Sequence, residues 1–284
     1  MEEFRLKPGE RLDDLQRDGL VLIQNPQYFC YGTDAVLLSW FADVRKGERA
    51  LDLCTGNGVI PILLSAKTEG DCFCGLEIQP DCADMARRSV FRNHLEQKIR
   101  IVQGDVREAS SVFGASSFHV ITVNPPYMAA ANGVQGKNPA RNIARAEILC
   151  TLRDVIRESA ALLPPRGRLY LVYRPYRFSE LMECLAEYRF SVSRLCMVHP
   201  KADREASMIL VSAVRDGHTE VHVDPPLVLM NADGTETDRL KEIYGRSGAV
   251  NRQICESCMP STVLKSADGS GAHRGGRPRG AMTQ

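Results

Sequence analysis

Apolar and amphipathic stretches alternate along the chain from residue 49 to residue 215, and this alternation predicts an α/β fold. Short apolar runs that end at turn signals predict buried strands over 49–54, 72–78, 99–104, 118–123 and 168–173. Helical periodicity covers 59–67, 81–95, 147–163 and 178–188. A short polar loop joins two later strand patterns, which predict an antiparallel hairpin over 194–199 and 207–215. We therefore expect a doubly wound, seven-stranded, mostly parallel sheet with an antiparallel seventh strand.

The same pattern divides the chain into three parts. Residues 1–45 form an N-terminal extension, with a strand near 19–23 and a short helix that opens at 31–34. Residues 46–245 carry the strand–helix units and predict one large domain. Residues 246–284 lose apolar periodicity, are rich in Gly, Ser and Arg, and hold six Lys and Arg against two Asp and Glu. Such a segment cannot bury a core, so we expect a disordered basic tail that either binds nucleic-acid phosphates or only aids solubility.

Composition is ordinary for a soluble protein, with 44% hydrophobic and 25% charged residues. No apolar run reaches membrane-spanning length and the N-terminus lacks a signal-peptide core, so we expect a cytoplasmic protein with no membrane partner. The ten cysteines lie mostly inside strand and helix patterns, which favours buried thiols over disulfides. Cys255 and Cys258 form a lone CxxC without a second pair, and we therefore predict no metal site.

The most informative motif is the turn that follows the strand pattern 118–123. Two prolines cannot continue a sheet, so Asn124-Pro125-Pro126-Tyr127 must turn sharply. It places a carboxamide, a proline carbonyl and an aromatic ring at the carboxyl end of a strand, where open α/β sheets bind ligands. These groups suit a flat molecule with an exocyclic amino group. Alone, the motif would favour a plain proline turn, and only the rest of the chain favours a ligand site.

The loop after the first strand, 52–58, is rich in glycine but is neither a dinucleotide fingerprint nor a Walker loop. Gly56 and Gly58 let the backbone approach a ligand closely, and Asp52 can face a cationic amino group. These properties suit the amino-acid end of S-adenosylmethionine, which carries no pyrophosphate. The alternative is a simple strand–helix turn.

Acidic residues end the next two strand patterns. Glu77 can accept the hydroxyls of a ribose. Asp105 can accept an adenine amino group, and Val106 can offer its backbone amide. Singly, each carboxylate fits a helix cap or a solvated loop. In series at successive strand ends, they predict one ligand site along one edge of the sheet.

With these motifs, the chain resembles the Rossmann-like class I S-adenosylmethionine-dependent methyltransferases that act on planar amino groups. Over roughly residues 10–245 it is similar to the tRNA(Val) adenine-N6 methyltransferase family. The closer resemblance is carried by three segments, which are 31–38 (Tyr-Gly-Thr-Asp-Ala-Val-Leu-Leu), 144–147 (Ala-Arg-Ala-Glu) and 225–245. The chain departs from the family at Ala146, where a histidine is usual, and at Glu236-Thr237, where the family has Tyr-Thr.

The resemblance implies N6-methylation of an adenine in tRNA, single-stranded or flipped, beside the anticodon. Asn124 and the Pro125 carbonyl would accept the two N–H bonds of the amino group, within the motif that Pro126 completes. Tyr127 would stack on the extruded base. The positions of Thr33 and Asp34 in the family motif imply that they contact the methionine end of the cofactor.

Basic side chains predict the RNA contacts. The loop after Tyr127 is expected to grip phosphates with Lys137, Arg141 and Arg145. The loop of the late hairpin adds Lys201 and Arg204. Each is also compatible with an ordinary solvated residue.

Several alternatives stay open on the sequence. A glutamine N5-methyltransferase acting on a protein would use the same clamp for a planar amide, and a DNA adenine would fit it too. An RNA-binding protein without catalysis is a further possibility, although the intact strand-end residues speak against it. A monomer and a homodimer fit the sequence equally.

Overall fold

The computed structural model describes residues 5–28, 30–125, 150–218 and 220–246. These residues lie in one compact unit, Met1–Ser247. Within these ranges, no helix has both the length and the apolar character needed to cross a membrane.

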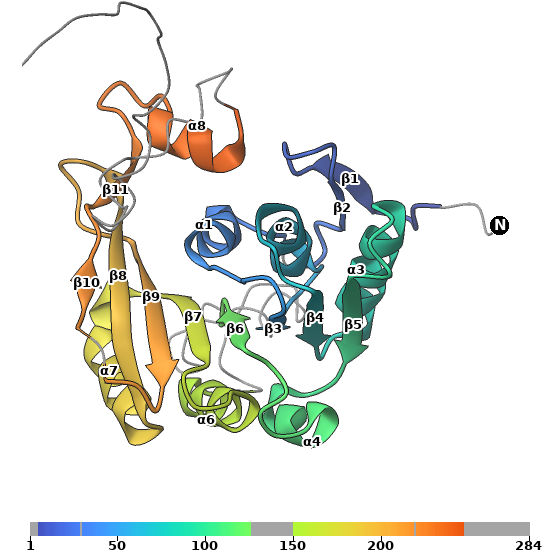
Figure 1. Ribbon diagram of the computed structural model, residues 1–284. Helices are drawn as coiled ribbons and strands as arrows, with labels where there is room; N and C mark the ends of the chain where they lie inside the picture. Colours follow the sequence, from blue (N-terminus) through green and yellow to red (C-terminus); the bar gives the residue numbers. More distant parts are fainter. Residues whose placement is uncertain (1–4, 29, 126–149, 219, 247–284) are drawn as a thin grey trace, which may run out of the picture. The chain divides into compact units, whose positions relative to one another are not determined.

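A nine-stranded sheet is the centre of this unit (Figure 1). Its strands are β3 (Arg49–Leu53), β4 (Cys72–Glu77), β5 (Ile99–Gln103), β6 (Val120–Val123), β7 (Arg168–Tyr173), β8 (Phe190–Lys201), β9 (Met208–Arg215), β10 (His222–Val223) and β11 (Leu227–Met230). They follow the order β10-β8-β9-β7-β6-β3-β4-β5, with β11 also paired to β8. In this sheet β9 is antiparallel to both of its neighbours, β7 and β8, and the other pairings are parallel. The predicted mostly parallel sheet with an antiparallel seventh strand is confirmed.

The sheet is larger than the seven strands expected, because β10 and β11 extend it beyond β8. Both are short and pair with the long strand β8, at His222–Arg194 and Leu227–Val198. Pro225 and Pro226 separate them. Proline cannot donate to a ladder, so the prolines confine pairing to two brief segments.

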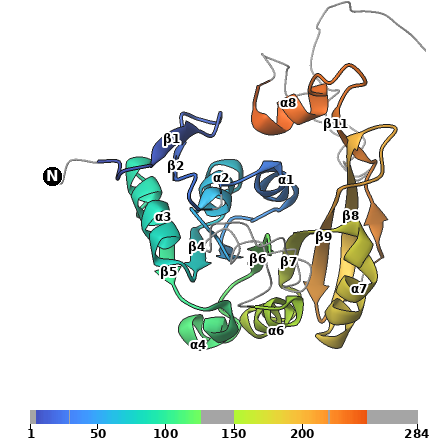
Figure 2. The same cartoon turned by 180° about the vertical axis from the view of Figure 1, so that it is seen from behind.

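Helices cover both faces of the sheet (Figures 1 and 2). On one face lie α1 (Thr33–Phe41), α2 (Val59–Lys67) and α3 (Pro80–Arg92), and on the other α4 (Ala109–Phe113), α6 (Leu152–Leu162) and α7 (Phe178–Glu187). The sheet has a hydrophobic core on each face, and successive residues of a strand point to opposite cores. Ala50 packs in the core with α1 and α2, whereas Leu51 packs in the core with α6 and α7. The apolar runs are therefore buried on both sides, as expected for parallel strands.

The helix predicted over 147–163 begins only at Leu152. Thr151 forms a capping box with Asp154: the Thr151 hydroxyl accepts from the Asp154 N–H, and the Asp154 carboxylate accepts from the Thr151 N–H at 3.0 Å. This reciprocal cap satisfies two N–H groups that a helix start leaves unpaired, and it fixes the boundary. Residues 147–149 lie outside the described ranges.

The N-terminal extension forms a separate two-stranded antiparallel sheet, β1 (Arg11–Asp14) and β2 (Val21–Gln24), which confirms the strand predicted near 19–23. Polar side chains of α3 hold β2. Asn93 donates from Nδ2 to the Val21 carbonyl at 2.7 Å and accepts from the Val21 N–H at 2.9 Å. The Ser89 hydroxyl accepts from the Ile23 N–H at 2.9 Å. The hairpin is thus fixed to the helix that follows β4.

Candidate active site

The ends of four neighbouring parallel strands bring the predicted polar residues to one edge of the sheet. Glu77 is the last residue of β4, Asp105 follows β5 by two residues, and Asn124 follows β6 directly. Asp52 lies one residue inside the end of β3. Because β5, β4, β3 and β6 are adjacent and parallel, their carboxyl ends meet at this edge.

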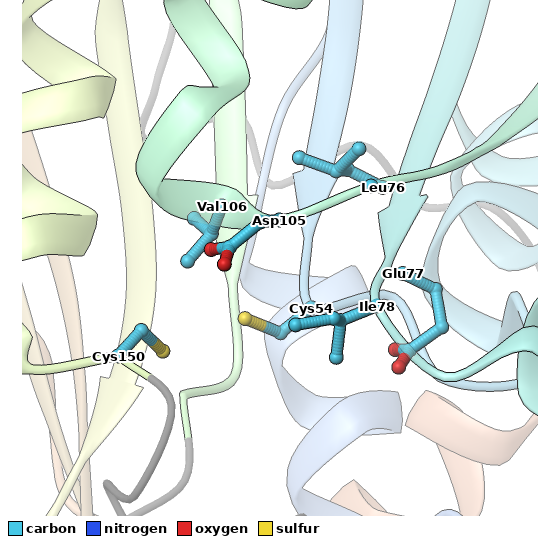
Figure 3. A pocket seen from close by; sticks show the side chains of 8 residues that line it. Cys54, Leu76, Glu77, Ile78, Asp105, Val106 and Cys150 are labelled. Atoms are coloured by element: carbon cyan, nitrogen blue, oxygen red, sulfur yellow. The ribbon is translucent and has the colours of Figure 1, made fainter.

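A small pocket, partly open to solvent, lies at this edge (Figure 3). It is lined by Cys54, Leu76, Glu77, Ile78, Gly104, Asp105, Val106 and Cys150. The sulfurs of Cys54 and Cys150 point into it from two sides, and the carboxylates of Glu77 and Asp105 flank it (Figure 3). Apolar walls with a few polar groups suit a flat heteroaromatic ring. Of the predicted cofactor residues, the pocket unites Glu77, Asp105 and Val106.

Glu77 holds the glycine loop. Its carboxylate accepts from the Gly56 N–H and from the Gln79 N–H, each at 2.8 Å. Glu77 is 5% exposed, and burial raises its pKa against the opposing effect of these two hydrogen bonds. A carboxylate has further lone pairs, so ribose hydroxyls can be accepted in addition.

Asp52 is buried with one carboxylate oxygen unsatisfied. Oδ1 accepts from the Thr122 hydroxyl at 2.7 Å, whereas Oδ2 has no hydrogen-bond partner within the described part of the chain. Burial raises the pKa of Asp52 to about 7, the nearby hydroxyls of Thr55 and Thr122 oppose this rise, and the charge of Glu77 adds to it. An unpaired buried carboxylate oxygen is costly, and a cationic group would satisfy it.

Backbone conformation explains both glycines of the loop. Gly56 and Gly58 have φ values of +57° and +84°, in the left-handed region that favours glycine. A Cβ at Gly58 would also lie 3.1 Å from the Ala86 Cβ on α3. Gly58 is the N-cap of α2, so the turn from β3 into that helix requires it.

Asp105 is already engaged by a neighbouring cation. It caps the 3₁₀ turn Val106–Glu108 by accepting from the Arg107 N–H at 2.9 Å, and it forms an ion pair with Arg107 Nη2 at 2.5 Å. The hydrogen bond from the Arg107 side chain lowers the pKa of Asp105, so the carboxylate stays ionised. Val106 lies beside it in the pocket.

Thr33 and Asp34 occupy the first turn of α1 and do not line this pocket. Thr33 accepts a hydrogen bond at 3.3 Å from the Tyr244 hydroxyl of α8 (Asp238–Tyr244), which ties the segment resembling the family near residue 245 to the start of α1. The Asp34 carboxylate accepts from the Ala35 N–H at 2.9 Å. The pocket lining likewise does not include Asp52, Gly56 or Gly58. Gly56 is connected to the pocket because its N–H donates to the lining residue Glu77.

The comparisons with known proteins agree with this geometry. Residues 31–191, more than half of the chain, match the model of the methyltransferase small domain family. A tRNA1(Val) (adenine(37)-N6)-methyltransferase from Porphyromonas gingivalis is 32% identical over 200 residues, which cover 68% of this chain and 77% of that relative. The chain belongs to the tRNA1(Val) (adenine(37)-N6)-methyltransferase family. A relative of the same name from Aeromonas hydrophila is 28% identical over 209 residues, which cover 73% of this chain and 85% of the relative.

Among solved structures, a predicted O-methyltransferase from Agrobacterium tumefaciens aligns with a TM-score of 0.61 at 21% identity. The alignment covers 78% of this chain and all of that one, and at this identity it supports the fold alone. Membership in the family makes this chain an S-adenosylmethionine-dependent methyltransferase. The site fits that cofactor: the unsatisfied Asp52 oxygen suits a cationic amino group, and the apolar pocket beside Glu77 and Asp105 suits an adenosyl ring.

The substrate side of the family's site is described only in part. Asn124 is half-buried and Pro125 is buried directly after β6. Pro126, Tyr127, Lys137, Arg141, Arg145 and the departure at Ala146 lie outside the described residues, as does the tail from 247 onward. Their predicted roles stay predictions. All eight cysteines within the described ranges are free thiols.

Lys201 and Arg204 lie at the carboxyl end of β8, which runs parallel to β7 and β6, so they share the edge with Asn124. Lys201 donates to the Ala232 carbonyl at 3.1 Å, and Arg204 is exposed. Asp203 and Glu205 accompany them, so the loop carries no net charge.

Sequence reasoning missed the polar groups that support the family's cofactor residues. Thr122, the partner of Asp52, lies inside an apolar run, and its role depends on the pairing of β6 with β3. Gln24 and Asn57 contact each other although 33 positions separate them. The sequence signal for Gln24 was an amide side chain at the end of the apolar strand Val21–Gln24. Cys150 enters the pocket only through the tertiary fold.

Proposed function

We propose that this protein transfers the methyl group of S-adenosylmethionine to the exocyclic amino nitrogen of an adenine in tRNA. The observation that carries the proposal is the position of Asn124 and Pro125, at the end of β6 and on the same sheet edge as the pocket of Glu77 and Asp105. The tRNA, and the adenine at position 37, come from the names of the relatives. A tRNA substrate also favours a cytoplasmic location.

Each predicted cofactor residue has a proposed task. The unsatisfied Asp52 oxygen would bind the cationic amino group, and Glu77 the ribose hydroxyls. The adenine edge would meet Asp105 and the backbone of Val106. The glycine loop and the start of α1 would enclose the amino-acid end with Gly56, Gly58, Thr33 and Asp34. When bound, the cofactor supplies an activated methyl group on a sulfonium.

The clamp would act on the amino group that receives the methyl. The amino nitrogen of adenine is a poor nucleophile because its lone pair is delocalised into the ring. Two acceptors, the Asn124 side-chain oxygen and the Pro125 carbonyl, would localise that lone pair and fix the nitrogen in position. Stacking of Tyr127 on the flipped base would add about 1–3 kcal/mol. A dedicated strong base is unnecessary, because the nitrogen loses its proton readily once it is methylated.

A glutamine amide fits the same two acceptors, so the clamp alone does not separate RNA from protein substrates. The relatives from Aeromonas hydrophila, Aeromonas salmonicida and Porphyromonas gingivalis are each named for tRNA, and this favours RNA. The two are separated by incubating the protein with radiolabelled cofactor and either total tRNA or total cell protein. We expect label in the tRNA fraction. Label confined to the protein fraction would contradict the proposal.

A pH dependence of cofactor binding is expected from Asp52. In the free protein burial holds the pKa of Asp52 at about 7, and a bound amino cation would favour the carboxylate and lower this pKa. Binding at pH 6 should therefore release a proton, and affinity should rise with pH until about 7. Calorimetry at pH 6 in two buffers of different ionisation enthalpy measures this release. In Asp52→Asn the measured binding enthalpy should no longer depend on the buffer. If the wild-type protein shows no buffer dependence, Asp52 does not pair with the amino group of the cofactor.

A modest contribution to tRNA binding is expected from Lys201 and Arg204. If both contact phosphates, the Lys201→Ala/Arg204→Ala protein should lower the slope of log affinity against log salt by roughly one per lost contact. The matched control is Arg45→Ala/Lys46→Ala, which removes two exposed cations at the amino end of β3, on the opposite edge. Filter binding over a salt series measures both. If the slope of log affinity against log salt is equal in the two variants, Lys201 and Arg204 do not contact the RNA.

A further inference from the structure

One buried carboxamide links three separate segments around the proposed cofactor site. Gln24 ends β2 and is 2% exposed. Its Oε1 accepts from the Tyr31 N–H at 3.0 Å and from Asn57 Nδ2 at 3.3 Å. Its Nε2 donates to the Asp13 carboxylate on β1. The acceptor oxygen of this amide and one of its two N–H donors are thus used.

The three partners belong to segments with different tasks. Tyr31 precedes Thr33, where α1 begins, by two residues. Asn57 stands between Gly56 and Gly58 and is 4% exposed. Asp13 belongs to the N-terminal hairpin. Gln24 therefore joins the hairpin to the glycine loop and to the first turn of α1.

The glycine loop is held from two sides. Glu77 accepts from the Gly56 N–H on the side of the pocket, and Gln24 accepts from the Asn57 side chain on the side of the hairpin. With Gln24 removed, Asn57 would lose this acceptor in a site closed to water. The glycine loop would then lose its hydrogen bond to the hairpin and keep the one to Glu77.

We propose that Gln24 is a positioning residue for the cofactor site, which holds the glycine loop and the first turn of α1 in the arrangement that binds S-adenosylmethionine. The inference rests on the proposed function, in which the glycine loop and the start of α1 enclose the cofactor. Gln24 acts through Asn57 and Tyr31 and touches no reacting group. The N-terminal extension is then a working part of the site.

Asn93 supplies a matched control. It is also a carboxamide that binds β2, through both the N–H and the carbonyl of Val21. It anchors the hairpin to α3, and its described contacts do not include the glycine loop. Gln24→Met and Asn93→Leu each replace an amide by an apolar side chain of similar shape. Comparison of the two separates anchoring of the hairpin from positioning of the loop.

The experiment measures the dissociation constant of S-adenosylmethionine by calorimetry and the midpoint of thermal unfolding. We expect Gln24→Met to weaken cofactor binding about tenfold or more, since at least one buried hydrogen bond to the loop is lost. Asn93→Leu should lower the unfolding midpoint and change the dissociation constant less than about twofold. An unchanged dissociation constant in Gln24→Met, or an equal loss in both variants, would overturn the inference.

A second pair of variants tests the same contact without an apolar replacement. Gln24→Glu sets a carboxylate against Asp13 and should weaken cofactor binding. Adding Asp13→Asn restores the hydrogen bond with donor and acceptor exchanged, and should return the dissociation constant to within about threefold of wild type. Failure of this rescue would also contradict the inference. A wild-type protein that does not bind the cofactor would instead overturn the proposed function.

Discussion

Replacing Asn124 by alanine is expected to lower methyl transfer to tRNA by about a hundred- to a thousandfold, the usual effect of removing one preorganised group that acts on the reacting atoms. The side chain follows β6 directly and supplies one of the two proposed acceptors for the amino group. The residues proposed to hold the cofactor are unchanged, so the dissociation constant of S-adenosylmethionine should stay within about twofold of wild type. Single-turnover methylation and calorimetry measure the two quantities separately.

The control for this prediction is Asn93→Ala, the same substitution at the C-terminal end of α3, which should retain methyl transfer. If Asn124→Ala loses cofactor binding together with activity, the residue supports the cofactor and the clamp assignment is wrong. If activity is retained, the clamp is wrong as well.

Replacing Glu77 by alanine is expected to have the opposite profile. Its carboxylate accepts two backbone N–H groups and is proposed to accept the ribose hydroxyls. Hydrogen bonds to a charged group are worth about 1.5–3 kcal/mol each, so the cofactor should bind about a hundredfold more weakly. The rate at saturating cofactor should change far less, because the groups on the substrate side are untouched.

Glu77→Gln is the matched variant. Its remaining carbonyl oxygen can accept from either Gly56 or Gln79, but the amide nitrogen cannot, so its effect should lie between wild type and Glu77→Ala. Equilibrium binding of the cofactor orders the three proteins. An affinity in Glu77→Ala equal to wild type would show that the carboxylate does not contribute to the cofactor site.

The sheet could be predicted well because its strands are buried on both faces. A strand such as β6 is buried throughout and apolar except at Thr122, so its existence and parallel neighbours follow from the pattern and the spacing of helices. The strand β10 has only two residues and no pattern of its own, and it could not be predicted. The strand β11 is an apolar run, but its place beside β8 depends on the tertiary fold. Thr151 carried a capping signal that marks the true start of α6.

Site residues could be predicted from the sequence where they directly end or follow a strand, because the strand then sets their position in the fold. Glu77 and Asn124 reach the common edge because their strands end there. The environment of Asp52 was not predictable, because its burial and its bond to Thr122 depend on the register between β3 and β6. The contact of Gln24 with Asn57 depends on how the hairpin packs, and local sequence does not encode that.

The most direct test of the central claim is nucleoside mass spectrometry on purified tRNA(Val) after incubation with this protein and S-adenosylmethionine. Two transcripts are compared, one with adenine at position 37 and one with guanine there. The account predicts N6-methyladenosine in the first transcript, at position 37, and no methylation of the second. Equal methylation of both transcripts, or a methyl group on another atom of the base, would contradict it.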